Sequence, residues 1–313
     1  MNRTKGKILV IRGGAIGDFI LTLPVLSALR ERFPETQIEV LGYPHIAQLA
    51  VAGGLADAVR YIEGRALAGY FARGGSLDPE LTAYFAGFHI VISYLYDPDE
   101  IFATNVRRAS TAQYITGPHR PDETRGVHAT ESLLQPLECL AIFGADPVPR
   151  LPNAVPVSTK RRLALHPGSG SEKKNWPEAK WSELLGRLLA ETKLNLLLVG
   201  GEAEGARLDR LARLAPTERL EVARGLPLTE LAERLRCCGG FVGHDSGITH
   251  LAAALGVRTV VLWGPSIEPV WRPRGENVVV VKSTEGLSHL SVDEVLARIH
   301  SAMLVASGSA ATP

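Results

Sequence analysis

Two loops in the second half of the chain combine residue types that can bind a diphosphate. The first, His166 to Pro177, reads HPGSGSEKKNWP, and the second, Gly243 to His250, reads GHDSGITH. Glycine loops and helix N-termini present backbone N–H groups to anions, and lysine adds a positive charge. Both loops follow short apolar runs, so we expect them to meet at one edge of a sheet. Capped helices and solvated lysines are the alternative explanation.

A third loop, near the start of the chain, carries a carboxylate suited to general-base catalysis. It runs from Arg12 to Asp18 (RGGAIGD), and its glycines, Gly14 among them, allow a ligand to approach the backbone closely. Aspartate is also a favoured helix cap, and Thr22 is an alternative cap if the helix starts near Pro24. The pattern leaves both roles of Asp18 open.

Cationic side chains collect between these loops, in the first half of the chain. They are Arg60, Arg65, Arg107, Arg108, Arg120, Arg125 and His128. Arginine binds carboxylates and phosphates through paired hydrogen bonds, so this set contains candidates for an anionic ligand, although most of it is expected to be solvated surface. Asp97-Pro98-Asp99 has the D-x-D form of some metal sites. It is also a common turn sequence, and we expect no metal site.

Alternating strand and helix patterns position these loops. In the first half, strands are expected at 7–11, 37–41 and 88–94, helices at 18–32 and 45–52, and mostly loops at 97–127. The second half predicts strands at 163–166, 194–199, 240–243, 259–263 and 278–281, with helices after Pro177 and at 203–214, 228–236, 248–255 and 291–304. Such alternation predicts α/β domains of the Rossmann type, in which ligands bind at the carboxyl ends of the strands.

A proline-rich break from Asp146 to Pro156 divides the two patterns. It predicts an N-terminal domain at 1–150 and a C-terminal domain at 151–306, facing each other across a cleft, with a disordered tail at 307–313.

Composition narrows the class of protein. The net charge of the 313 residues is only +1, which argues against a nucleic-acid partner. The three cysteines, Cys139, Cys237 and Cys238, have no metal-ligand or disulfide spacing. No signal peptide or membrane-spanning run is visible, so a cytoplasmic location is expected, with peripheral contact at the inner face of the inner membrane left open.

The motifs resemble those of the bacterial lipopolysaccharide heptosyltransferases, in the order that the family has them. The resemblance rests on the segment from Ile8 to Pro24, on Lys174-Asn-Trp176-Pro177 with Trp181, on the segment from Phe241 to His250, and on Trp263-Gly264-Pro265. It implies an inverting, metal-independent enzyme of the GT-B fold that uses no cofactor. The C-terminal domain would bind an ADP-heptose donor, and the N-terminal domain a lipopolysaccharide core or another anionic glycolipid or glycan.

The resemblance also implies roles for individual residues. Asp18 matches the catalytic base. Ser169 and Lys174 match contacts to the diphosphate, Glu204 a contact to the ribose, and Leu226 a neighbour of the adenine. The diphosphate and the donor sugar would further contact Asp245, Ser246, Gly247 and His250. For the acceptor, the candidates are Gly14, Arg60, Arg120 and His128.

The expected reaction is a single displacement. Asp18 would take a proton from the acceptor hydroxyl as this attacks the anomeric carbon, while Lys174, His250 and the helix N-terminus stabilise the departing diphosphate. The alternatives are an epimerase-like GT-B enzyme and a non-catalytic protein that binds sugar nucleotides. A nicotinamide oxidoreductase is disfavoured, because the G-x-G-x-x-G fingerprint is absent.

Overall fold

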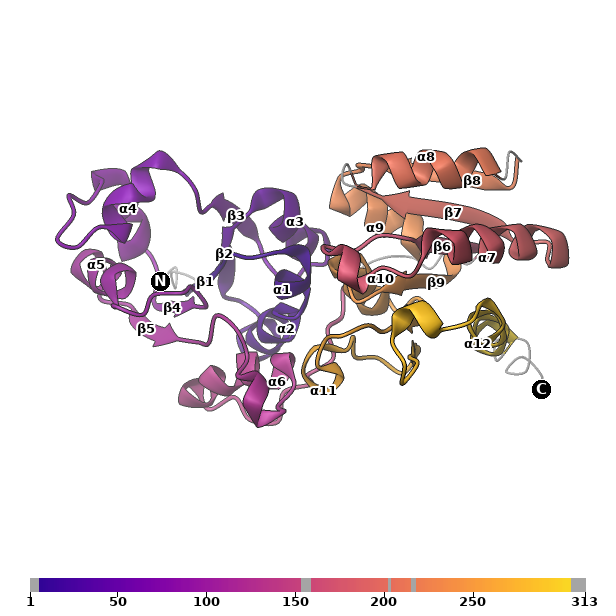
Figure 1. Cartoon of the computed structure of the whole chain (residues 1–313). Coiled ribbons are helices and arrows are strands. Elements are labelled where there is room, and N and C mark those ends of the chain that lie inside the picture. The colour runs from indigo at the N-terminus through magenta and orange to yellow at the C-terminus, as the bar shows by residue number, and fades with distance from the viewer. Residues whose placement is uncertain (1–5, 153–158, 202–203, 215–217, 305–313) are drawn as a thin grey trace, which may run out of the picture. The chain divides into compact units, whose positions relative to one another are not determined.

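The computed structural model describes residues 6–152, 159–201, 204–214 and 218–304, which form two compact α/β units (Figure 1). The first unit spans Met1–Asn153 and the second Ala154–Pro313. Each contains one parallel sheet, as the alternating pattern predicts. The predicted tail at 307–313 and the end of the proline-rich break, from residue 153, lie outside the described residues.

The first unit contains a five-stranded sheet in the order β3-β2-β1-β4-β5. Its strands are β1 (Lys7–Arg12), β2 (Gln37–Gly42), β3 (Ala58–Tyr61), β4 (Ile90–Ser93) and β5 (Gln113–Thr116). Its helices are α1 (Ile16–Ile20), α2 (Leu23–Arg32), α3 (Pro44–Ala52), α4 (Pro79–Ala86), α5 (Ile101–Ala109) and α6 (Ala129–Leu134). The central strand β1 is buried from Ile8 onward, as expected for a parallel strand covered on both faces.

The second unit contains a six-stranded sheet in the order β11-β10-β9-β6-β7-β8. Its strands are β6 (Thr159–His166), β7 (Asn195–Gly200), β8 (Leu220–Arg224), β9 (Cys238–His244), β10 (Thr259–Leu262) and β11 (Val278–Val281). Its helices are α7 (Glu178–Glu191), α8 (Gly205–Leu214), α9 (Leu228–Arg236), α10 (Gly247–Ala254), α11 (Glu268–Trp271) and α12 (Val292–Leu304). Because all the pairings are parallel, the carboxyl ends of β6 and β9 lie side by side at one edge.

The helix predicted after Pro177 is confirmed as α7, and one of its faces is apolar. Trp181, Leu184, Leu185 and Leu188 are buried in the main core of the second unit. Helix α7 packs between α8 and α12 over the sheet. This packing fixes the start of α7, where the candidate diphosphate loop from His166 to Pro177 ends.

Two expectations for the first unit are wrong. The helix expected at 18–32 is two helices, α1 and α2, which meet at Leu21 and Thr22. Pro24 accounts for the break, because proline lacks an N–H donor and is tolerated only in the first turn of a helix. The segment at 97–127 is not mostly loop, since it contains the helix α5 and the short strand β5. Strands β3 and β8 were also not expected from the sequence.

Candidate functional site

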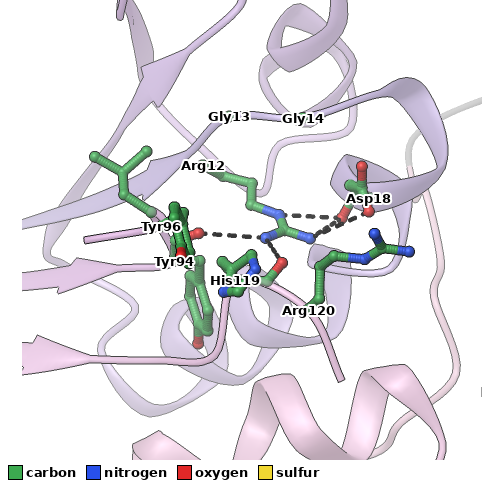
Figure 2. A pocket seen from close by; sticks show the side chains of 9 residues that line it. Arg12, Gly13, Gly14, Asp18, Tyr94, Tyr96, His119 and Arg120 are labelled. Atoms are coloured by element: carbon green, nitrogen blue, oxygen red, sulfur yellow. Dashed lines mark hydrogen bonds and ion pairs between the residues drawn. The ribbon is translucent and has the colours of Figure 1, made fainter. Parts of the chain in front are cut away.

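A pocket of about 460 Å³ lies within the first unit, around the carboxylate of Asp18 (Figure 2). Its lining comes from the loop after β1, from the segment after β4 and from the segment after β5. The lining residues are Arg12, Gly13, Gly14, Asp18, Tyr94, Leu95, Tyr96, His119 and Arg120. The predicted candidates Gly14, Asp18 and Arg120 therefore share one pocket at the carboxyl edge of the sheet.

Asp18 is the third residue of α1, and its carboxylate is held at the start of that helix. The Oδ2 atom accepts a hydrogen bond of 2.9 Å from the backbone N–H of Ala15. Gly14 has a φ of +99°, and a Cβ there would lie 2.8 Å from the same oxygen, so only glycine fits beside this carboxylate. Asp18 therefore caps α1 from its third position, and not as the N-cap residue. About a third of its side chain is exposed, which is compatible with a second role as a base.

Arg12 joins the three segments that line the pocket. The sequence patterns did not identify it as a functional residue. Figure 2 shows its guanidinium between Asp18 on one side and Tyr94 and His119 on the other. It donates to the backbone oxygens of Asp18 (3.3 Å), His119 (2.9 Å) and Tyr94 (3.4 Å), and its Nη2 lies 3.6 Å from the Oδ1 of Asp18. Burial lowers the pKa of Arg12, and the Asp18 carboxylate opposes this effect. The only sequence signal was a charged residue at the end of an apolar strand.

The outer part of the pocket is aromatic and cationic. The rings of Tyr96 and His119 lie 4.7 Å apart, and Tyr96 is largely exposed. Together with Arg120 they offer a π-face and a positive charge beside Asp18. A sugar ring and an acidic group are ligands that such side chains can bind.

Arg60 and His128 do not line this pocket. The guanidinium of Arg60 pairs with Glu80 at 2.9 Å and lies over the ring of Tyr84 at 4.4 Å. His128 is buried and is the N-cap residue of α6, where its Nδ1 accepts from the backbone N–H of Thr130 at 3.2 Å. These contacts stabilise the fold of the first unit, and the acceptor role of both residues stays a prediction.

Asp97, the first acid of the D-x-D sequence, caps a helix. Its carboxylate accepts the backbone N–H groups of Phe102 and Ala103 at the start of α5. Within the described ranges, no group of three or more His, Cys, Asp or Glu side chains is placed to hold a metal ion.

In the second unit, Lys174 and Asp245 form an ion pair between the two predicted phosphate loops. The Nζ of Lys174 lies 2.6 Å from the Oδ2 of Asp245. The hydroxyl of Ser266, which follows β10, donates to the same oxygen. Asp245 is buried, whereas a third of the Lys174 side chain is exposed. The aspartate thus holds the ammonium at the loop surface, and Ser266 is a member of this group that the sequence analysis missed.

The N-terminus of α10 lies directly after Asp245. Ser246 is the N-cap residue, and its hydroxyl accepts from the backbone N–H of Thr249 at 3.3 Å. Gly247 is the first residue of the helix and His250 the fourth, with the His250 side chain buried. Gly256, which has a φ of +75°, follows the helix, as is common for glycine after the end of a helix. The positive end of the helix dipole therefore lies beside Lys174 and adds to a local positive potential.

Ser169 and Glu204 lie on loops of the same sheet edge. The hydroxyl of Ser169 donates to Asn175 Oδ1 at 2.8 Å. Glu204 accepts from the N–H of Gly201 at 2.9 Å and packs so close to Gly168 that a Cβ there would lie 2.2 Å from its Cγ.

Leu226 follows β8 and is half-buried at the start of the segment that leads to α9. All eight donor candidates thus follow carboxyl ends of strands in one sheet.

Two buried histidines form hydrogen bonds to these loops. His166 ends β6 and His244 ends β9, and burial lowers their pKa to about 3 and about 4 respectively. The Nδ1 of His166 lies 3.4 Å from the Ser246 hydroxyl. The His244 ring bonds to the backbone of Gly168 and of Trp176. Both rings are neutral near pH 7, so the positive charge of the site comes from Lys174 and the helix.

Much of the second half of the chain matches a known protein family. Residues 143–297 match glycosyltransferase family 9 (heptosyltransferase). Lipopolysaccharide heptosyltransferase 1 of Salmonella typhimurium is 34% identical over 146 residues, which is 46% of this chain and 45% of that protein. The match therefore spans about half the length of that relative.

Solved structures share the fold over nearly the whole chain. A glycosyl transferase of family 9 from Veillonella parvula superposes with a TM-score of 0.78 at 19% identity, covering 97% of this chain and 99% of that one. The E. coli heptosyltransferase WaaC, solved with ADP, gives a TM-score of 0.73 at 20% identity, covering 95% and 99%. The predicted GT-B fold is confirmed. No described helix combines the length and the apolar character that crossing a membrane requires.

Proposed function

We propose that the chain transfers a heptose or a related sugar from an ADP-sugar to a cell-envelope glycan. The premise is that the chain belongs to glycosyltransferase family 9 through its residues 143–297. The acceptor would be a lipopolysaccharide core or another anionic glycolipid or glycan. One observation carries the proposal: Lys174 and the N-terminus of α10 lie together at one sheet edge of the second unit. This is a site for a diphosphate leaving group that uses a lysine and a helix end in place of a metal.

The reaction would be one displacement with inversion. The acceptor hydroxyl oxygen forms a bond to the anomeric carbon, and the bond from that carbon to the diphosphate oxygen breaks. Asp18 accepts the hydroxyl proton, and the electron pair of the broken bond leaves with ADP. Support for this role comes from the position of the Asp18 carboxylate, which is fixed through Oδ2 and lies beside a pocket large enough for a sugar.

Donor recognition would use the loops of the second unit. We assign the diphosphate to Lys174, Ser169 and the α10 N-terminus, with Ser246, Gly247 and His250 near the donor sugar. Glu204 and Leu226 would contact the ribose and the adenine. Support comes from the placement of these residues at the carboxyl edge of one sheet, where ligands of such sheets bind, and from a structural neighbour that was solved with ADP.

Acceptor recognition would use the pocket of the first unit. Arg120 would bind an acidic group of the acceptor. Gly14, which has no side chain, would let the acceptor approach the backbone closely.

Asp245 is not assigned as a base, because its carboxylate is buried and paired with Lys174.

The proposal is tested by nucleotide binding followed by transfer. Thermal unfolding is measured with ADP, UDP, GDP and NAD, each with and without EDTA, since a ligand that binds the folded state raises the melting temperature. ADP-selective stabilisation that EDTA leaves unchanged is expected. ADP-heptose is then supplied with a lipopolysaccharide core acceptor, and the product is identified by mass spectrometry.

Each other outcome points to a different function. A preference for UDP or GDP would replace the donor, and turnover of the sugar nucleotide without acceptor would favour an epimerase-like enzyme. ADP binding without transfer or hydrolysis would leave a non-catalytic sugar-nucleotide-binding protein.

A further inference from the structure

The loop between β6 and α7, residues 167–177, contains little regular structure of its own. Its one regular element is the short 3-10 helix at Glu172–Lys174. The Ser169 hydroxyl bonds within the loop, to Ser171 and Asn175. Arg207 of α8 braces the outer side by donating to the Pro167 oxygen and pairing with Glu172. These contacts join the loop to itself and to α8, and they do not join it to β9.

His244 makes that attachment at both ends of the loop. Its Nε2 accepts a hydrogen bond of 2.8 Å from the backbone N–H of Trp176, where the loop ends. Its Nδ1 lies 3.2 Å from the backbone oxygen of Gly168, near where the loop begins. An acceptor Nε2 and a carbonyl partner for Nδ1 require the neutral tautomer with its proton on Nδ1. One ring therefore ties together two backbone groups that are eight residues apart.

The surroundings of the ring fix its orientation. His244 is fully buried, and the ring of Trp181 on α7 packs edge-on against it, with centroids 5.4 Å apart. The next residue, Asp245, holds Lys174, which lies between the two attachment points. The end of β9 thus fixes the ends of the loop through His244 and its middle through Asp245.

We propose that His244 is a positioning residue for the donor site: by donating to Gly168 and accepting from Trp176, its imidazole holds the loop that presents Ser169 and Lys174 to a diphosphate. This inference rests on the proposed function, because it takes that loop to bind the donor. His244 touches no substrate. Its substitution changes binding by releasing the loop, so the donor parameters change while those of the acceptor do not.

The test measures ADP affinity by calorimetry and the KM for the donor and for the acceptor in full-length variants. His244→Leu removes both hydrogen bonds and leaves two backbone groups buried without partners. We expect its ADP affinity and donor KM to worsen by about tenfold or more, with an unchanged acceptor KM. His244→Asn keeps a donor near the Nδ1 position and His244→Gln an acceptor near the Nε2 position, so each is expected to lie between His244→Leu and the wild type. These milder variants also serve if His244→Leu does not fold.

A matched control separates positioning from general stability. Thr259→Val removes a buried hydrogen bond at the amino end of β10 in the same sheet, away from the loop. It is expected to lower the melting temperature and to leave ADP affinity unchanged. The inference is overturned if the His244 variants bind ADP as the wild type does, or if they lose no more affinity than Thr259→Val. A wild-type protein that binds no ADP overturns the proposed function instead.

Discussion

The Arg12–Asp18 pair of the first unit and the Lys174–Asp245 pair of the second both lie at the carboxyl edge of their sheets, and the two pairs are arranged in opposite ways. In the first unit the cation is buried and the anion open: Arg12 is 5% exposed and Asp18 32%, with 3.6 Å between them. In the second unit the anion is buried and the cation open: Asp245 is 9% exposed and Lys174 34%, at 2.6 Å. One pair presents a carboxylate to its surroundings and the other an ammonium group.

In the proposed reaction, this difference would divide the two halves of a group transfer between the two units. An exposed carboxylate that a buried cation orients can accept a proton. An exposed ammonium that a buried carboxylate holds can stabilise a leaving diphosphate. In each pair the buried partner orients the exposed one. Exchanging or removing single members of the pairs tests this division of roles.

The largest effect is expected from Asp18→Asn. The amide keeps the size of the side chain but accepts no proton, so kcat is expected to fall by about 10²–10⁴-fold. ADP affinity is expected to stay unchanged, since Asp18 lies in the other unit. Steady-state kinetics and calorimetry measure both. Asp57→Asn is the control, because Asp57 also accepts a backbone N–H and pairs with an arginine. Wild-type turnover by Asp18→Asn would remove the base from the mechanism.

Lys174→Met is expected to have the next largest effect. It removes the exposed cation and leaves Asp245 buried without its ion-pair partner. We expect kcat to fall by about 10²–10³-fold, and ADP affinity and the free energy of unfolding to fall with it. Lys180→Met provides the control. Lys180 lies on α7, and its ammonium group also donates hydrogen bonds, but to backbone carbonyl oxygens. An undiminished kcat together with weaker ADP binding would limit Lys174 to donor binding.

Arg12→Gln tests the buried member of the first pair. Asp18 loses the charge that orients it, and we expect kcat to fall by about 10–100-fold, as for a misplaced catalytic group. Arg12→Lys should recover part of the activity.

The control for Arg12 is Arg30→Gln, in the same unit. Arg30 also bonds to backbone carbonyls and to an aspartate, but away from the pocket. Arg30→Gln is expected to lower the free energy of unfolding without changing kcat. If Arg12→Gln behaves in the same way, Arg12 has only a structural role.

The effect expected from acid is on stability and not on turnover, and it lies in the unit that contains the second pair. His166 and His244 have pKa values of about 3 and about 4 in the folded protein, below the ordinary value of 6.5. The unfolded chain therefore binds more protons as the pH falls below 6.5, and stability is lost down to these lower values. The loss is about 2 kcal/mol per histidine by pH 5. The groups that face His244 are His166, Glu172, Arg207 and Asp245.

Denaturant unfolding between pH 7 and pH 5 measures this loss. Hydrogen exchange locates it, and the amides at 168–176 are expected to lose more protection than those of β1. Equal loss in both places would contradict the assignment to the second unit. An unfolding free energy that does not change with pH would show that these histidines are not held neutral.

Much of the fold could be read from local patterns, and the errors have identifiable causes. The buried strands β1 and β10 and the helix α7 were predicted from apolar residues whose spacing does not depend on distant contacts. Strand β5 was missed because only one of its four residues is buried and because its place in the sheet depends on pairing with β4. Helix α5 was missed because proline and aspartate precede it, although Asp97 turns out to be its cap.

The features of the candidate site can also be divided into those that the sequence predicts and those that depend on the tertiary structure. The sequence by itself determined which loops follow strands and contain the residue types for chemistry, because motifs such as GHDSGITH are local. Only the tertiary structure decided how charges pair and which partner is buried. Arg12 meets His119 across 107 positions and Lys174 meets Asp245 across 71, and folding alone brings such distant residues together. Burial then sets which member of each pair stays open to a substrate, since exposure depends on packing by elements far along the chain.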